Sequence, residues 1–69
     1  MRYFFDIVGG SELHSDEFGR DLQTFASAQR FARMLATELR KGGRFCGSTF
    51  VRVVDEYDRT ILECPVFVQ

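Results

Sequence analysis

The pattern of apolar positions between Thr24 and Lys41 predicts one amphipathic α-helix. At about 100° per residue, the apolar side chains gather on one broad face. These residues are Phe25, Ala28, Phe31, Ala32, Leu35, Ala36 and Leu39. Thr24 is the predicted N-cap, and the Gly42-Gly43 pair supplies a residue that tolerates positive φ where the helix ends. The rest of the chain is therefore expected to cover this apolar face.

Short segments rich in β-branched and aromatic residues predict four strands around the helix. They run from Arg2 to Val8, Glu12 to Ser15, Thr49 to Asp55 and Thr60 to Phe67. The last two form a hairpin, with Asp58 in a left-handed conformation at its turn. Because Pro65 cannot donate to a ladder, the fourth strand is expected to end at a sheet edge or past regular pairing.

The segment from Asp16 to Leu22 is polar and predicts a connection into the helix. Gly19 permits a tight turn there, and Phe18 and Leu22 are expected to tuck under the helix. The element order is ββαββ, which predicts a two-layer α+β fold: an antiparallel sheet with the helix, residues 24–41, packed on one face. Residues 1–69 form one small domain.

Alternation along the strands places apolar side chains on both faces of this sheet. Tyr3, Phe5 and Ile7 face one side. Phe4 and Val8, together with Phe50 and Val54 of the last hairpin, occupy the face that we expect the helix to leave open. An open face normally alternates to polar residues, so these four side chains predict the surface of a homodimer.

An alternative is that other segments of the chain cover the open face and leave a monomer. The candidate segments are Arg44 to Ser48 and the C-terminal Val66-Phe67-Val68.

Three stretches together resemble a family of small, uncharacterised alphaproteobacterial proteins. They are Arg2-Tyr3-Phe4-Phe5-Asp6, the linker Asp16-Glu17-Phe18-Gly19-Arg20-Asp21-Leu22 and the closing Cys64-Pro65-Val66-Phe67. In that family the linker carries Asp-Glu-x-Gly, and the last turn carries Gly where this chain has Asp58. The resemblance implies the fold and no activity. A fainter likeness links the chain to small antitoxin domains that pair with ribonuclease toxins, and it is an analogy of fold only.

No arrangement of residues predicts a catalytic, cofactor or metal site. His14 is the single histidine, and it has no second His or Cys at ligand spacing. Cys46 and Cys64 lack Cys-x-x-Cys spacing, and a turn near Tyr57 would place Cys64 opposite Phe50, so both are interpreted as small buried thiols. The serines have no neighbouring base.

The outer face of the helix carries a basic stripe formed by Arg30, Arg33, Arg40 and Lys41. Such a stripe could meet phosphates or an acidic partner. The alternative interpretation is that long basic side chains simply solvate the outer face of a helix. A net charge of −1 also argues against strong nucleic-acid binding by the whole domain.

The sequence therefore predicts a non-enzymatic cytosolic module that binds protein and self-associates. The rival hypothesis is a nucleic-acid or acidic-partner binder, an antitoxin-like regulator, acting through the basic stripe. Asp6 interrupts the apolar start before a signal peptide can form. No uncharged apolar run approaches the roughly 20 residues that span a bilayer.

Overall fold

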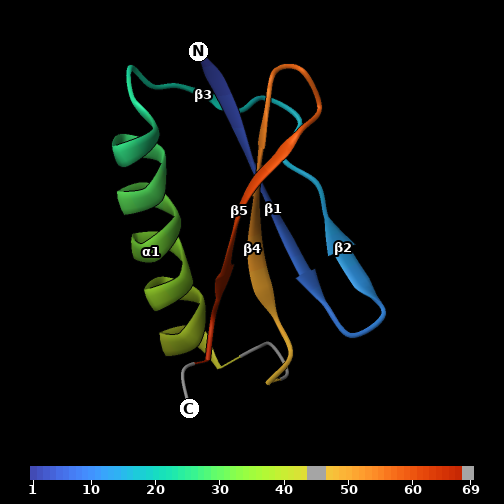
Figure 1. The fold of residues 1–69 in the computed structure, drawn as a ribbon. Coiled ribbons are helices and arrows are strands. Elements are labelled where there is room, and N and C mark those ends of the chain that lie inside the picture. The colour runs from blue at the N-terminus through green and yellow to red at the C-terminus, as the bar shows by residue number, and fades with distance from the viewer. Residues whose placement is uncertain (44–46, 68–69) are drawn as a thin grey trace.

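The computed structural model describes residues 1–43 and 47–67, which form an α-helix packed on one face of an antiparallel sheet (Figure 1). The elements are β1 (Arg2–Gly9), β2 (Glu12–His14), β3 (Arg20–Asp21), α1 (Phe25–Gly42), β4 (Phe50–Asp55) and β5 (Thr60–Pro65). The predicted two-layer α+β fold is confirmed. The short strand β3 is an addition, because it lies in the segment that the sequence predicted as a connection.

The strand order is β2-β1-β4-β5, and β3 also pairs with β1. Every pair of neighbouring strands is antiparallel. Since β4 occupies one edge of β1 along most of its length, β2 and β3 share the other edge, one near each end of β1. The two long strands at the centre of the sheet are thus held on both sides.

The ends of α1 follow the predicted caps. The Thr24 hydroxyl accepts a hydrogen bond from the Ser27 amide at 3.1 Å. Gly43 adopts a left-handed conformation with φ of 67°, and its amide donates to the Arg40 carbonyl at 3.3 Å. Only a residue without Cβ adopts this conformation at little cost, so the glycine pair ends the helix.

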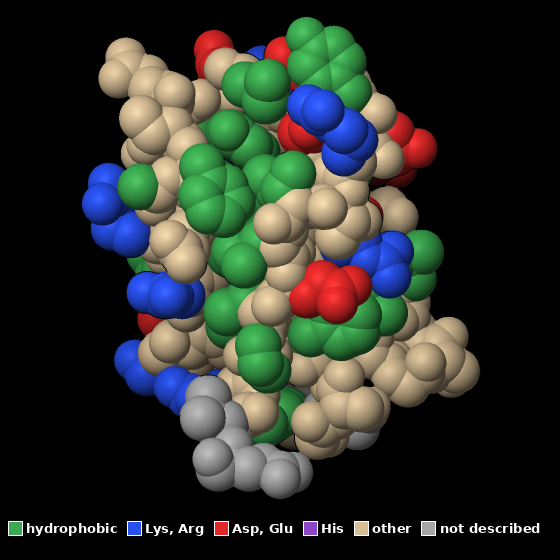
Figure 2. Space-filling view, in the orientation of Figure 1, with side chains coloured by type: hydrophobic (Ala, Val, Ile, Leu, Met, Phe, Trp, Pro, Cys, Tyr) green, Lys and Arg blue, Asp and Glu red, His purple; other side chains and the backbone are tan. Residues whose placement is uncertain are grey.

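The helix contacts the sheet through its alanines. Ala28, Ala32 and Ala36 are buried, whereas the larger Phe31, Leu35 and Leu39 are only half-buried beside them. In the described part of the chain outside α1, the buried apolar residues are Tyr3, Phe5, Val51, Val53 and Val66. Small side chains let the helix backbone approach the strands closely. Apolar side chains therefore gather along the seam between α1 and β5, where the helix does not cover them (Figure 2).

One residue of the predicted apolar face does not join the core, since Phe25 in the first turn of α1 is 46% exposed. The ring of Phe31 packs edge-on against Phe5, with ring centroids 4.7 Å apart. The guanidinium of Arg20 covers the ring of Phe31 at 4.4 Å from its centroid. The Arg20 side chain, which comes from β3, thus covers the part of the Phe31 ring that the contact between α1 and the sheet leaves exposed.

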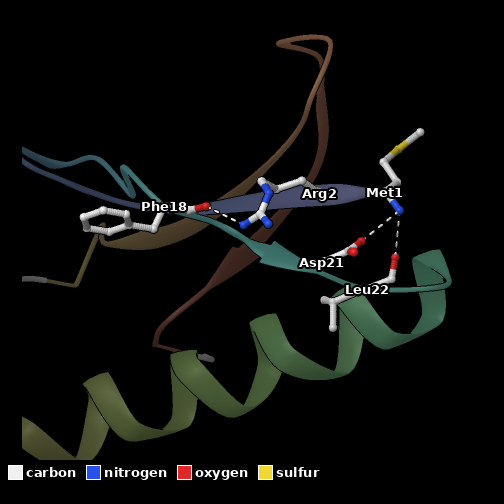
Figure 3. Close-up of polar contacts among 5 residues, drawn as sticks. All are labelled: Met1, Arg2, Phe18, Asp21 and Leu22. Atoms are coloured by element: carbon white, nitrogen blue, oxygen red, sulfur yellow. Dashed lines mark hydrogen bonds and ion pairs between the residues drawn. The ribbon is translucent and has the colours of Figure 1, made fainter.

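Strand β3 is held to the start of β1 by the chain terminus (Figure 3). The Leu22 amide donates to the Met1 carbonyl at 3.0 Å. The N-terminal amine in turn contacts the Asp21 carboxylate and the Leu22 carbonyl, each at 3.2 Å. These bonds extend the pairing of Arg2 with Asp21 beyond the strand.

The carboxylate of Asp16 closes the gap that β2 and β3 leave on the edge of β1. Its Oδ2 accepts a hydrogen bond from the Phe5 amide at 3.1 Å. The Asp16 amide donates in return to Oδ1 of Asp6 at 2.9 Å. The Phe5 amide would otherwise be left without a partner at a break in the ladder.

The register of the last hairpin differs from the sequence prediction. Cys64 pairs with Val51, and Phe50 pairs with Pro65, so the register differs by one residue from the rough placement of Cys64 opposite Phe50. A β-bulge between Val53 and Val54 inserts one extra residue in β5, and such a shift moves the later side chains to the other face. Asp58 has φ of 64°, which confirms its predicted left-handed conformation.

Two further predictions about loop and tail residues are corrected. Phe18 does not tuck under the helix, because its side chain is 80% exposed, whereas Leu22 packs against the core as expected. Val66 is buried in the core beside the helix, and Phe67 packs against that core. These two residues therefore do not cover the open face. Gly47 and Ser48 of the predicted cover line a hollow beside Phe50, and residues 44–46 and 68 lie outside the described residues.

Candidate functional site

The face of the sheet away from α1 carries two apolar cross-strand pairs. Phe4 lies opposite Val54, and Val8 lies opposite Phe50, all four half-buried. The four residues predicted as a dimer surface thus share one face, which we call the open face. The pairs lie at opposite ends of this face.

A polar row crosses the open face between the two apolar pairs. Asp6 lies opposite Arg52, which lies opposite Glu63. The Arg52 Nε is 3.9 Å from Glu63 Oε2, and the Arg52 guanidinium carbon lies 5.8 Å from the centroid of the Phe50 ring. The arginine is therefore already paired within the chain, and its stem and ring contact add apolar area to the Phe50 end of the face.

The two edges of the sheet are poorly suited to pairing with another chain. Strand β2 has three residues, and on it the Nε2 of His14 lies 3.4 Å from the Oε2 of Glu12. Strand β5 is interrupted by the bulge and ends at Pro65, which has no amide to donate. Short, charged or proline-containing edges resist strand addition. The open face is the better candidate for contact with another molecule.

Two hollows mark the ends of the open face. One, of about 290 Å³, is lined by Phe4, Val54 and several carboxylates. The other, of about 380 Å³, is lined by Phe50, Pro65, Glu63 and residues 47–49. Despite the carboxylates, no group of three or more His, Cys, Asp or Glu residues in the described part of the chain could hold a metal ion.

The Asp55 carboxylate at the first hollow organises the β4–β5 turn. Its Oδ1 accepts from the amides of Tyr57 at 2.9 Å and Arg59 at 3.0 Å, and its Oδ2 accepts from the Arg59 Nε at 2.8 Å. Burial raises the pKa of Asp55, but these hydrogen bonds and the Arg59 charge outweigh it, so the pKa lies below its ordinary value.

The Asp16 carboxylate at the same hollow is also used internally. Burial raises its pKa, but hydrogen bonds from the amides of Gly19, Phe5 and Phe18 lower it, as does the charge of Arg2. The net effect is a lowered pKa. Both aspartates are thus ionised acceptors that hold turns, and neither is a candidate general base.

The basic stripe lies along the outer side of α1, where Arg30, Arg33, Arg40 and Lys41 are all exposed (Figure 2). The Nζ of Lys41 lies 3.8 Å from the Oε1 of Glu38. The Nη1 of Arg40 lies 3.5 Å from the carbonyl oxygen of Val66. Among the described residues, the three arginines form no ion pair. Arg33 and Arg40 line a third hollow, of about 260 Å³, with Thr37, Cys64 and Pro65.

Comparison with known proteins gives the family. The family model described as Domain of unknown function (DUF6894) matches residues 2–67. The chain belongs to the DUF6894 family. No curated protein and no solved structure matches it. The resemblance to a family without assigned activity is therefore confirmed at the level of a domain of unknown function.

The remaining candidate side chains of this DUF6894 domain are accounted for by local contacts. His14 is exposed and lies beside Glu12 on β2. Cys64 is a free, half-buried thiol at the third hollow, not the fully buried thiol that the sequence predicted, and Cys46 lies outside the described residues. Within the described ranges, no helix is long and apolar enough to cross a membrane.

The hollow between α1 and β5 was not predictable from the sequence. Arg33 and Arg40 stood out as part of the basic stripe, but the bulge in β5 determines that Cys64 and Pro65 lie beside them. Nothing in the local sequence around Thr60 marks that bulge.

Proposed function

We propose that this DUF6894 domain is a non-enzymatic protein-interaction module that self-associates through its open face. The observation that supports the proposal is the pairing of Phe4 with Val54 and of Val8 with Phe50 on the side opposite to α1. Solvated sheet faces alternate to polar residues, whereas this face keeps one apolar pair on each side of its polar row, and exposed apolar patches mark interaction sites.

A second copy suits this face because a two-fold axis lets one patch serve both partners. The blunted edges at β2 and Pro65 disfavour the other route, in which edge strands pair. The polar row would have to be desolvated, and this costs least if Arg52 keeps Glu63 as its partner. Self-association of moderate strength is therefore expected.

The substitution Phe50→Lys should convert the dimer to a monomer. It places a charge at the centre of one apolar pair, while Phe50 is only half-buried within one chain, so the fold should survive. Light scattering after size exclusion measures the mass, and circular dichroism checks the fold. Met34→Lys is the matched control, because Met34 is 54% exposed on α1, away from the open face.

A wild-type mass that stays monomeric at high protein concentration would remove self-association. A Met34→Lys variant that dissociates as readily as Phe50→Lys would instead move the interface to the helix.

A second candidate function, binding of an acidic protein segment, is favoured by the hollow beside the basic stripe. Arg33 and Arg40 face it from two turns of α1, and no described carboxylate neutralises them. The helix carries four of the nine basic residues of the chain and one of its ten acidic residues. The positive charge is thus concentrated on one surface although the domain is net acidic.

For the same stripe we expect no binding of nucleic acid. Only four clustered basic side chains could neutralise phosphates, so binding would release few counterions from the nucleic acid. The domain has a net charge of −1, whereas a typical nucleic-acid binder is strongly basic. A gel shift with mixed RNA or DNA at low micromolar protein should therefore show no complex. A complex that forms and is then lost in the triple variant Arg30→Ala/Arg33→Ala/Arg40→Ala would make nucleic-acid binding the leading function.

A further inference from the structure

The hollow between α1 and β5 differs in charge from the two hollows at the open face. Arg33, Thr37 and Arg40 line it from the helix, and Cys64 and Pro65 line it from the strand. Among the residues that the structure describes, no Asp or Glu lines this hollow, whereas both hollows at the open face contain carboxylates. An anion would therefore meet two positive charges here and no negative one.

The regular periods of the helix and the strand bring these side chains together. The helical residues at the hollow are spaced by three, four and seven positions, so they share one side of α1. Cys64 lies opposite Val51, and the two side chains of such a pair point to the same face of the sheet. Because Val51 belongs to the core that packs against the helix alanines, Cys64 also faces α1.

The two guanidiniums are the groups in this hollow that can still donate to a ligand. Within the described part of the chain, Arg33 forms no ion pair, and Arg40 uses one N–H for the Val66 carbonyl at 3.5 Å. A guanidinium has five N–H donors. The Thr37 hydroxyl, in contrast, already donates to the Arg33 carbonyl at 3.0 Å.

The walls of the hollow are apolar. They are formed by Ala36, Cys64 and Pro65, and the small side chain of Ala36 leaves a space of about 260 Å³ between helix and strand. Figure 2 shows apolar side chains along this seam and Lys and Arg side chains on its α1 side. A phosphate group has no apolar part to cover such walls. A peptide segment can carry a carboxylate and an apolar side chain on neighbouring residues.

We propose that the hollow binds a segment of another protein in which an acidic residue adjoins an apolar one. The carboxylate contacts the guanidiniums of Arg33 and Arg40, and the apolar side chain packs on Ala36 and Pro65. Hydrogen bonds between guanidinium and carboxylate are short and strong, and apolar walls strengthen the attraction by lowering the effective dielectric constant. The proposal rests on the second candidate function, binding of an acidic segment, and adds the requirement for an apolar neighbour.

Two labelled peptides of equal length and charge test this requirement by fluorescence anisotropy. In the first peptide each Glu is next to a Leu, and in the second Ser replaces every Leu. The Leu peptide should bind about tenfold more tightly, since partial burial of one Leu side chain accounts for a factor of this size.

Paired substitutions locate the contact on the helix. Arg33→Gln/Arg40→Gln should raise the dissociation constant of the Leu peptide about tenfold, through the loss of two partly exposed ion pairs. Arg30→Gln/Lys41→Gln is the matched control. It removes the same charge from the basic stripe, but neither residue lines the hollow, so it should have a much smaller effect.

Cys64 reports occupancy of the hollow by a readout that does not depend on charge. In a Cys46→Ser background it is the single thiol of the chain, and it is half-buried at the hollow. A saturating concentration of the Leu peptide should slow the alkylation of Cys64 by iodoacetamide, followed by mass spectrometry. The Ser peptide at equal concentration should protect the thiol less.

The outcomes separate this proposal from the functions on which it depends. Equal affinity of the two peptides, equal loss in the two paired variants, or unprotected Cys64 would overturn the proposal while binding of acidic segments stands. Displacement of the Leu peptide by inorganic phosphate at similar concentration would overturn it in favour of a phosphate ligand. Absence of binding by both peptides would overturn the second candidate function as well. The mass of the Phe50→Lys variant tests self-association independently.

Discussion

Replacing Asp55 by Asn is expected to lower the denaturant midpoint of unfolding by more than any other neutralisation of a single carboxylate in the described chain. Asp55 is 3% exposed and accepts three hydrogen bonds that close the β4–β5 turn, from the Tyr57 and Arg59 amides and the Arg59 guanidinium. An amide can keep one oxygen as acceptor but must turn its NH₂ group toward a donor. Chemical denaturation followed by circular dichroism measures the change.

The same carboxylate should make the domain acid-sensitive. The folded-state pKa of Asp55 is lowered from the ordinary value of 3.8, so between the two values the unfolded chain binds more protons than the folded one. The stabilisation is fully present above the unfolded pKa and is lost as the pH falls through the folded pKa. In the Asp55→Asn variant this part of the pH dependence should disappear.

Glu56→Gln is the matched control for Asp55→Asn, because Glu56 is exposed in the same turn and its loss changes the net charge equally. Equal midpoints for the two variants, or an acid transition of unchanged size in Asp55→Asn, would contradict the role given to this carboxylate.

The parts of the fold that depend on short-range pattern were predictable. The caps of α1, its apolar face and the left-handed Asp58 all follow from residues close together in the sequence. The strand β3 was not predictable, because its partner lies far along the chain. The bulge between Val53 and Val54 was not predictable either, because no residue of that hairpin marks it. Arg20 and Asp21 have no strand-like pattern of their own. They pair because Tyr3 and Arg2 of β1 lie opposite them.

The open face likewise has features that the sequence predicted and one that it did not. Alternation alone placed Phe4 and Val8 on one side of β1, and the antiparallel register then set them against Val54 and Phe50. The display of Phe18 could not be predicted, because an apolar residue after Asp16-Glu17 is more simply expected to be buried. The position of the Asp16 carboxylate, between the Phe5 amide and the turn, decides the outcome.

The contact between α1 and the sheet leads to a second large expected effect, from Ala32→Leu. Ala32 is 0% exposed at the centre of the alanine row, whereas the larger Leu35 is only half-buried. A leucine at this position cannot fit without pushing the helix from β4 and β5, and overpacking of this kind costs about 1–3 kcal/mol. Ala26→Leu changes helix propensity equally at an exposed position of α1 and should leave the midpoint almost unchanged. If both variants unfold at the midpoint of the wild type in a urea titration, the helix does not rest on its alanines.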